Sequence, residues 1–334
     1  MTGRRAAVWL GFAVSGLLVW IAVRRIDFGV VFDTLGAVTW WVVAPSLIVL
    51  AAAIFLRALR WRALFEPHSR PPVGATVRAT LIGLMFNWIL PLRAGEASRV
   101  LALARETRAS RVEVLATAVA ERLFDVLALL LLLFVATPFL PSVSWLGTAA
   151  VAALALTTAL TATIVTLLVW GERPLRWVLG GLARLPRISV ERTEFAATNV
   201  VRGLAALRRP GIATRGVVLT LVSWFAVALS NWLLLVGFDF DVGFGAALLV
   251  TIATNLSLVV PASPGAIGTF EAAVIVALSA YGVDESRALS YAILLHLLNS
   301  LPIIPAGLVA LHWSASAGGA VPVASAGRSS TTNN

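Results

Sequence analysis

Six uninterrupted apolar stretches in this chain are each long enough to cross a lipid bilayer. The hydrocarbon core of a bilayer is about 30 Å thick, and a helix needs about 20 predominantly apolar residues to cross it. The six stretches are residues 6–23, 38–56, 119–139, 146–170, 217–238 and 288–311. In lipid, only helices and closed barrels satisfy all the backbone hydrogen-bonding groups. We therefore predict an all-α fold, a polytopic transmembrane helical bundle.

Two further apolar regions, residues 79–104 and 244–280, are interrupted by proline and glycine. The breaks lie at residues 91–95 and 261–268. Non-helical backbone at membrane depth is tolerated only where protein or a water-filled cavity covers it. Broken helices at corresponding positions of two halves are typical of transporter binding sites. We therefore predict that each region forms a broken-helix, re-entrant hairpin.

All 26 basic residues of the chain are Arg, and they are spread unevenly. They concentrate in residues 57–78, 93–122 and 171–216, whereas residues 138–145 and 239–243 contain none. The positive-inside rule places the Arg-rich segments in the cytoplasm. Both chain termini are then cytoplasmic, and the two hairpins enter from opposite faces. Each half has the order span, hairpin, span with opposite polarity, which describes an inverted repeat.

We predict a single integral membrane domain over residues 1–313, located in the cytoplasmic (inner) membrane. Its longest polar region, residues 171–215, is expected to be an Arg-rich cytoplasmic linker. Within this linker, residues 174–185 have the pattern of an interfacial amphipathic helix, with a solvated connector as the alternative. Residues 314–334 are rich in Ala, Ser, Gly and Thr without periodicity, which predicts a disordered tail.

The composition excludes several kinds of chemistry. The chain has no Cys, and its three His are scattered, so we expect no disulfide, no thiolate chemistry and no metal site. We also expect no cofactor and no catalytic residues, because the sequence has no nucleophile elbow and no paired-Asp metal motif. The net charge of +10 in a chain that is 59% hydrophobic indicates Arg-rich loops facing anionic lipid, and not a nucleic-acid partner.

The first break offers an arrangement that suits an anion. Gly95 permits a positive φ, and the helix is expected to resume near Glu96, so free backbone N–H groups would point toward the break. Helix N-termini bind anions such as phosphate, and Arg93 adds a planar guanidinium suited to the same ligand. Glu96 and Arg99 lie three residues apart on one helix face and are expected to pair. With Asn87, these side chains form the predicted substrate site.

The second break repeats this pattern without an Arg. Asn255 precedes the break, Ser263 fits a helix N-cap, and Gly265 and Gly268 allow close backbone approach. Glu271 follows, about two turns into an apolar helix. Charged groups at membrane depth cost roughly 2.5–3.5 kcal/mol on insertion scales, so they are usually paired and functional. We therefore include Asn255, Gly265, Gly268 and Glu271 in the predicted substrate site.

A lone carboxylate at this depth needs a partner. We expect Glu271 to pair with Arg93 or Arg122 of the other half, which would close the site between the two halves. Glu121 and Asp125 are four residues apart, face the same way and are expected, with Arg122, to support the site by neutralising the hairpin arginines. A purely structural role for these three residues is the alternative.

Three other polar residues lie within apolar stretches, at Asn231, His296 and Asn299. His296 and Asn299 share one helix face. Isolated polar side chains in membrane helices often only bond a neighbouring helix. We interpret these three residues as structural.

The motifs resemble the flippase-like, lysylphosphatidylglycerol synthase transmembrane family, also called UPF0104. The residues that carry the resemblance are Arg57-x-x-Arg60-Trp61, Asn87-x-x-x-Pro91-x-Arg93-x-Gly95-Glu96-x-x-Arg99, Glu121-Arg122-x-x-Asp125 and Pro261-x-x-Pro264-Gly265-x-x-Gly268-x-x-Glu271. The resemblance covers about residues 8–312. It implies a membrane domain that moves lipids between leaflets, notably aminoacylated phosphatidylglycerol when the domain is fused to a cytosolic synthase. Only residues 314–334 follow here, so we do not expect this chain to synthesise the lysyl-lipid.

We predict an integral membrane lipid flippase-like transporter that moves an anionic phospholipid or lipid-linked substrate between leaflets. One alternative is a membrane enzyme that acts on lipid phosphate or polyprenyl phosphate through buried carboxylates and Arg. Another is an accessory protein that scaffolds a lipid or glycan synthase in envelope synthesis. The expected partners are an anionic membrane lipid, such a synthase in the last case, and a second copy of the chain if it forms a homo-oligomer.

Overall fold

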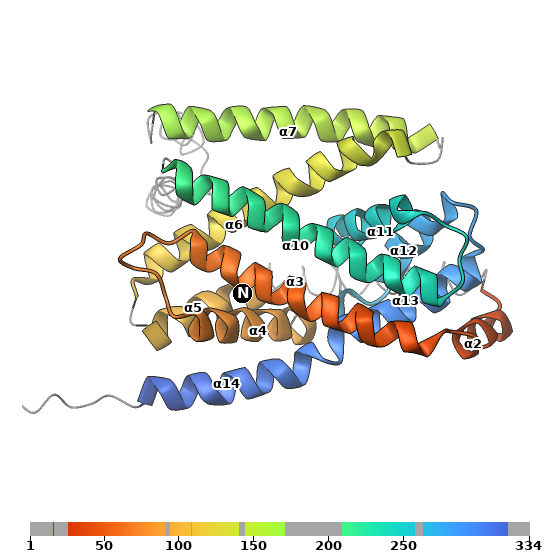
Figure 1. The fold of residues 1–334 in the computed structure, drawn as a ribbon, viewed down its shortest axis with the longest axis horizontal. Helices are drawn as coiled ribbons and strands as arrows, with labels where there is room; N and C mark the ends of the chain where they lie inside the picture. The colour runs from red at the N-terminus through yellow and green to blue at the C-terminus, as the bar shows by residue number, and fades with distance from the viewer. Residues whose placement is uncertain are drawn as a thin grey trace, which may run out of the picture.

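The computed structural model of the protein describes residue 16 and residues 26–90, 94–107, 109–139, 144–170, 209–257 and 263–319. All regular structure in these residues is helical, with no strand, which confirms the predicted all-α fold (Figure 1). The α-helices are α2 (Phe28–Gly36), α3 (Val43–Ala63), α4 (Val73–Ile89), α5 (Gly95–Thr107), α6 (Arg111–Ala136), α7 (Ser144–Trp170), α10 (Pro210–Gly237), α11 (Phe244–Ser257), α12 (Thr269–Ser279), α13 (Glu285–Ser300) and α14 (Ile303–Gly319). The short 3-10 helices are η1 (Trp40–Val42), η3 (Thr137–Phe139) and η5 (Pro264–Ala266).

Three helical segments of the described chain are long and apolar enough to cross a membrane. They are Trp40–Ala63, Pro210–Gly237 and Glu285–Ser316. Each contains most of one predicted crossing stretch. α6 and α7 have 26 and 27 residues and overlap two further predicted stretches. The stretch at residues 6–23 lies outside the described residues, apart from residue 16.

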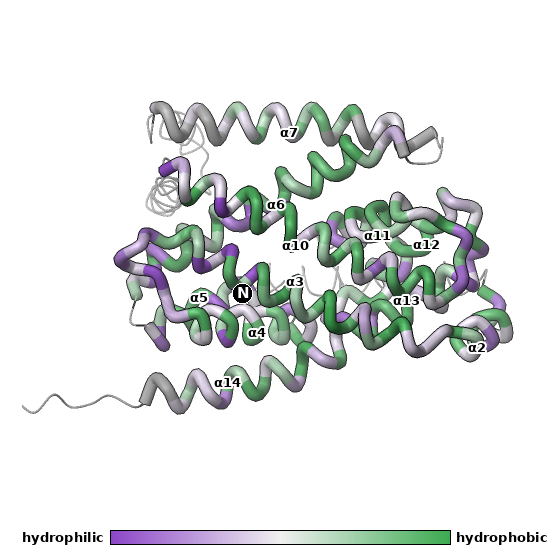
Figure 2. The backbone as a smooth tube through the Cα atoms, viewed as in Figure 1, coloured by the Kyte–Doolittle hydropathy of each residue, from purple (hydrophilic) through white to green (hydrophobic). Residues whose placement is uncertain are grey.

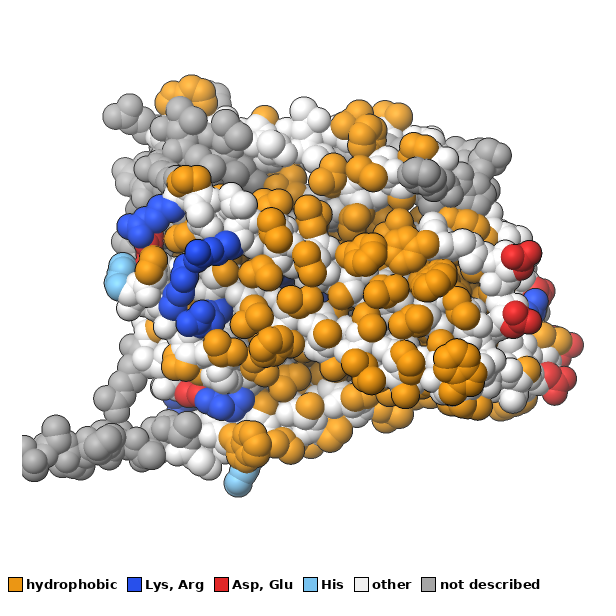
Figure 3. Space-filling view, viewed as in Figure 1, with side chains coloured by type: hydrophobic (Ala, Val, Ile, Leu, Met, Phe, Trp, Pro, Cys, Tyr) orange, Lys and Arg blue, Asp and Glu red, His pale blue; other side chains and the backbone are white. Residues whose placement is uncertain are grey.

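Hydrophobic residues predominate along the middle of the backbone (Figure 2). On the face that Figure 3 shows, apolar side chains cover the middle and charged side chains gather at the two ends of the long axis. One end is mainly basic and the other mainly acidic on the face that Figure 3 shows. Large apolar side chains in the middle are open to the surroundings, for example Ile48, which is 69% exposed. A broad exposed apolar surface between charged ends marks a membrane interaction site.

The predicted crossing stretch at residues 288–311 consists of two helices, which corrects the expectation of one continuous helix. Leu301 and Pro302 separate α13 from α14. A proline lacks a backbone N–H and clashes with the carbonyl four residues earlier, so it breaks or kinks a helix. α14 then continues through Gly319, beyond residue 314, where the disordered tail was expected to begin. Residues 320–334 lie outside the described part of the chain.

α3 and α10 pack along each other through the centre of the molecule and join its two halves. Ser46 Oγ of α3 donates to the carbonyl oxygen of Ser230 at 3.0 Å, and Ser230 Oγ donates to the carbonyl oxygen of Ser46 at 2.9 Å. Both serines are buried. Small polar side chains at such contacts let helix backbones approach closely and bond across the interface.

α4 and α5 form one helical hairpin, and α11 and α12 form a second one in the other half (Figure 1). In the first hairpin, a Cβ atom on Gly95 would overlap the carbonyl oxygen of Gly83 and lie 2.6 Å from Asn87 Oδ1. Gly95 does not use the positive φ that glycine permits. Glycine is required there because α4 and α5 approach each other closely.

The two hairpins meet where the C-terminal end of α4 contacts η5. Gly265 in η5 has a φ of 72°, and a Cβ atom there would lie 3.6 Å from the carbonyl oxygen of Trp88. α14 also reaches the first hairpin, because a Cβ atom on Gly307 would overlap the Met85 side chain and lie 3.0 Å from the Leu81 carbonyl oxygen. The last described helix therefore packs on the N-terminal half.

Candidate functional site

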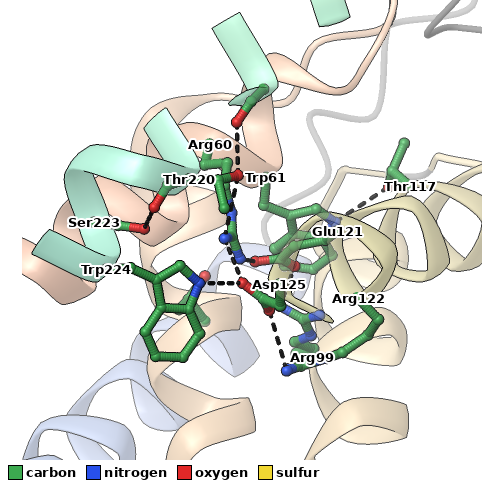
Figure 4. A network of polar contacts seen from close by, with 12 residues as sticks. Arg60, Trp61, Arg99, Thr117, Glu121, Arg122, Asp125, Thr220, Ser223 and Trp224 are labelled. Carbon is green, nitrogen blue, oxygen red and sulfur yellow. Dashed lines mark hydrogen bonds and ion pairs between the residues drawn. The ribbon is translucent and has the colours of Figure 1, made fainter. Parts of the chain in front are cut away.

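Arg60 is a fully buried arginine in the middle of a carboxylate pair (Figure 4). Its Nη2 lies 2.5 Å from Glu121 Oε1, and its Nη1 lies 2.5 Å from Asp125 Oδ1. The Arg-rich segment at residues 57–78 was predicted as a loop between two spans, and for Arg57 and Arg60 this was wrong because α3 continues to Ala63. The continued helix places Arg60 in contact with Glu121 and Asp125 of α6 and with Thr220 of α10.

Arg99 of α5 links the first hairpin to this pair. Its Nη1 lies 2.6 Å from Glu121 Oε2, and its Nη2 lies 2.9 Å from Glu96 Oε2. The predicted pairing of Glu96 with Arg99 is thereby confirmed. The Arg99 guanidinium also stacks over the Trp61 ring, with Cζ 4.6 Å from the ring centroid. A guanidinium over an indole gains cation–π attraction, so Trp61 helps to hold a cation that has left water.

Arg122 is the third arginine that pairs with these carboxylates, and it is more exposed than Arg60 and Arg99. It pairs with Glu96, and its Nη1 lies 3.3 Å from Asp125 Oδ2. Asn87 Nδ2 donates to Glu96 Oε1 at 3.4 Å. We call Arg60, Glu96, Arg99, Glu121, Arg122 and Asp125 the charged cluster. It contains three cations and three carboxylates, so their formal charges cancel. The structure thus brings together Asn87, Glu96, Arg99, Glu121, Arg122 and Asp125, as predicted.

Two tryptophans and two threonines frame the charged cluster (Figure 4). Trp224 Nε1 of α10 donates to Asp125 Oδ1 at 3.1 Å, and Trp61 Nε1 donates to Thr117 Oγ1 at 3.1 Å. Arg60 Nη1 also donates to Thr220 Oγ1 at 3.5 Å. Asp125 and Arg60 therefore have hydrogen-bond partners on α10 in addition to their ion pair, and such extra bonds help a buried ion pair to offset its desolvation.

Arg57 lies beside the charged cluster, one helical turn before Arg60. Its Cζ lies 5.6 Å from the centroid of the Trp224 ring, and its side chain is partly buried. It forms no ion pair with any carboxylate of the described residues, although Asp125 and Glu121 are close enough to interact through space. Because the cluster itself is balanced, Arg57 adds one excess positive charge when only the described residues are counted.

The second hairpin builds a different polar site. Glu271 lies in the first turn of α12, not two turns into it as predicted, and its Oε2 accepts a hydrogen bond from the Gly268 backbone N–H at 2.6 Å. Gly268 has a φ of 86°, which favours glycine. Asn255 does not join this site, because its Nδ2 donates to the carbonyl oxygen of Thr251 in its own helix.

His296 is the partner of Glu271, with Nδ1 lying 2.6 Å from Glu271 Oε1. The prediction of Arg122 as the partner was wrong, because Arg122 pairs within the charged cluster. The other predicted partner, Arg93, lies outside the described residues. α12 packs against α13, so a carboxylate on α12 finds its partner in its own half of the molecule. Asn299 Nδ2 donates to the carbonyl oxygen of Leu295 in its own helix.

The sequence analysis missed Arg60, Trp61 and Trp224 as members of the site, and it assigned His296 to a structural role. The signal for the first two was present, since Arg57-x-x-Arg60-Trp61 continues the helical spacing of the preceding apolar stretch. No local signal marked Trp224, and the position of His296 within an apolar stretch did not indicate its pairing with Glu271. Among the described residues, no group of three His, Asp or Glu is placed to hold a metal ion.

The fold and the buried charged cluster define an all-helical integral membrane protein. The chain belongs to the family of lysylphosphatidylglycerol synthase transmembrane regions, whose model matches residues 8–307. It is similar to a UPF0104 membrane protein of Methanothermobacter thermautotrophicus, with 25% identity over 294 residues that cover 84% of each chain. A second UPF0104 membrane protein of that organism is 24% identical over 250 residues, which cover 70% of this chain and 73% of the relative. These matches confirm the resemblance inferred from the motifs.

Proposed function

We propose that the protein moves an anionic phospholipid or lipid-linked substrate between the leaflets of the cytoplasmic membrane, without catalysing a reaction. The observation that carries this proposal is the charged cluster with its excess cation at Arg57, buried in a membrane protein beside a broken helical hairpin. Such groups are costly at membrane depth and usually mark a substrate path. Each carboxylate of the cluster is paired with Arg, which favours electrostatic binding over acid–base chemistry.

The proposed topology places the basic end of the molecule in the cytoplasm, together with both chain termini. The hairpin α4–α5 then enters from the cytoplasmic side and α11–α12 from the opposite side, as an inverted repeat. The contact between α4 and η5 supports this arrangement, because hairpins that enter from opposite faces meet near the middle of the membrane. Rocking of the two halves about that contact would expose the site to each side in turn.

The proposed headgroup site lies at the open side of the charged cluster. The Arg122 side chain is 34% exposed, compared with 6% for Arg99 and 0% for Arg60. Arg57 and Arg122 both lie near Asp125, so an anion can approach the two guanidiniums together. Guanidinium groups bind phosphate in a bidentate manner. In this scheme Arg60 and Arg99 fix the carboxylates, while Arg57 and Arg122, with Arg93, contact the lipid phosphate.

The proposal is tested with protein reconstituted into vesicles that contain fluorescent phosphatidylglycerol. We expect faster leaflet exchange than in protein-free vesicles, and at least about a tenfold loss in both Arg57→Gln and Arg122→Gln, which corresponds to about 1.4 kcal/mol. Arg62→Gln is the matched control, because Arg62 lies on the same helix but donates to the Pro71 carbonyl oxygen, away from the cluster. Unchanged exchange in both cluster variants, or no exchange by the parent protein, would contradict the proposal.

A further inference from the structure

The Glu271–His296 pair is a second ionisable site, separate from the charged cluster. Both side chains are largely buried, at 16% exposure for Glu271 and 12% for His296. The imidazole lies between two aromatic rings, with centroid distances of 4.9 Å to Trp88 and 4.9 Å to Phe270. Trp88 belongs to the first hairpin, whereas Phe270 and Glu271 belong to the second. The pair therefore lies at the junction of the two hairpins.

No other charged side chain of the described residues bonds to this pair. α11 and η5 contain no ionisable residue. The other ionisable residues of α13, of the elements packed against α12, α13 and η5, and of the caps of α2 and α13 are Asp27, Asp33, Arg78, Arg215, Asp284, Glu285, Arg287, Tyr291 and His312. Arg78 pairs with Glu106, Arg287 stacks over Phe240, and Tyr291 donates to the Asn231 carbonyl oxygen. Among the described residues, no ion pair therefore links Glu271 or His296 to another charged side chain.

The chemistry of the pair suits reversible proton binding. The Gly268 N–H fixes one carboxylate oxygen, and the other faces Nδ1, so a proton on Nδ1 is shared with a carboxylate that keeps its orientation. With that single proton the pair has a net charge of −1, and a second proton on Nε2 brings it to zero. Imidazole is the side chain that normally changes charge between about pH 5 and 8.

Two adjacent residues connect this pair to the charged cluster. Trp88 packs against the His296 ring, and its neighbour Asn87 donates to Glu96 of the cluster. Both residues lie in the last turn of α4, next to the first hairpin break. An imidazolium is attracted to the faces of aromatic rings, so proton uptake at His296 strengthens its contact with Trp88. Release of the proton weakens this contact between the two hairpins.

We propose that Glu271 and His296 form a proton-binding site whose occupancy sets the spacing of the two hairpin ends. Given the proposed transport function, this site couples the movement of the anionic headgroup to proton uptake and release. Protonation holds the end of α4 against α12 and α13, and deprotonation frees it. Asn87 transmits that movement to Glu96, the carboxylate that holds Arg122 at the open side of the charged cluster.

The absence of cysteine from the chain makes a direct test possible. Ile89→Cys and Ile267→Cys place spin labels at the two hairpin ends, because these side chains are 44% and 56% exposed. The distance between the labels is measured by pulsed electron paramagnetic resonance in lipid nanodiscs at about pH 5 and about pH 8. We expect a shift to shorter distances at the lower pH. Glu271→Gln and His296→Gln should each abolish the shift, and Asn299→Ala, one turn further along α13, should retain it.

Two results would overturn this inference. The first is a label distance in the parent protein that does not change with pH, and the second is an unaltered shift in either pair variant. Size-exclusion chromatography shows whether each variant is folded. The distance measurement on one folded variant of the pair is sufficient to test the inference. The measurement needs no lipid transport. A pH-dependent distance without leaflet exchange would reject the proposed transport function, whereas exchange without a pH-dependent distance would reject the proton site.

Discussion

Gly95 of α5 lies against the backbone carbonyl of Gly83 in α4, with no room for a side chain between them. This contact sets the spacing of the first hairpin. It also places Asn87 and Glu96, which flank the break, within hydrogen-bonding distance of each other. The charged cluster therefore depends on a pair of glycines as much as on its own ions.

We expect Gly95→Ala to destabilise the protein by about 1–3 kcal/mol or more, because overpacking of a close contact has costs of that order. Thermal unfolding in detergent measures this change. Gly147→Ala is the matched control, since no atom lies within 4 Å of a Cβ at that position of α7. Equal melting temperatures for the two variants would show that the hairpin can open without penalty.

Removal of Arg60 should have a large effect on stability. Arg60→Ala leaves Glu121 and Asp125 without their shared buried cation, and breaking a buried pair in this way typically costs about 3–5 kcal/mol. Arg209→Ala should change the free energy of unfolding by at most about 1 kcal/mol, since Arg209 is 59% exposed in its pair with Glu66. We expect partial recovery when Asp125→Asn is added to Arg60→Ala, because Arg99 and Arg122 then balance Glu96 and Glu121. An additive further loss would argue against charge compensation.

The reciprocal serine bonds between α3 and α10 should be weak individually. Polar contacts between membrane helices average about 0.6 kcal/mol in double-mutant cycles. We predict a coupling energy of that size for Ser46→Ala combined with Ser230→Ala, measured by unfolding in mixed micelles. A coupling above about 2 kcal/mol would exceed the range known for such contacts and would indicate a repacking of the two helices.

A comparison of Ala variants at Gly265 and Gly282 separates the cost of backbone strain from the effect of the contact between the two hairpins. Both have positive φ values, of 72° and 75°, so replacement by Ala should cost about 1–2 kcal/mol at each position. Only Gly265 lies near the Trp88 carbonyl; a Cβ on Gly282 would meet no atom within 4 Å. We expect equal losses of stability but slower leaflet exchange in Gly265→Ala alone. Equal exchange rates in the two variants would show that the contact between η5 and α4 has no role in leaflet exchange.

Hydropathy and helix-breaking residues were sufficient to predict the helical fold, most of the long helices and the two breaks. The end of α3 was missed because Arg57 and Arg60 are typical of a loop when read locally. Their burial depends on Glu121 and Asp125, which lie 61 and 65 residues after Arg60. A pairing over that distance leaves no trace in local periodicity. The break at Pro302 was missed because the apolar stretch continues on both sides of it.

The candidate site was also predicted only in part, because local spacing reveals contacts within one helix but not contacts between distant helices. Glu96 and Arg99 are one helical turn apart, so their pairing could be inferred from spacing. Glu271 and His296 are separated by 25 residues on two helices, and only the packing of α12 on α13 brings them together. The expected pairing of Glu271 with an Arg rested on charge alone, which does not determine which helices are neighbours.

α14 belongs to the C-terminal half by sequence but packs on α4 and α5 of the N-terminal half. α14 therefore forms a second contact between the two halves, in addition to the α3–α10 interface. The two halves do not move as independent rigid bodies while α14 stays packed on α4 and α5. The interruption at Leu301 and Pro302 is the point where the chain could bend if the two halves rock relative to each other.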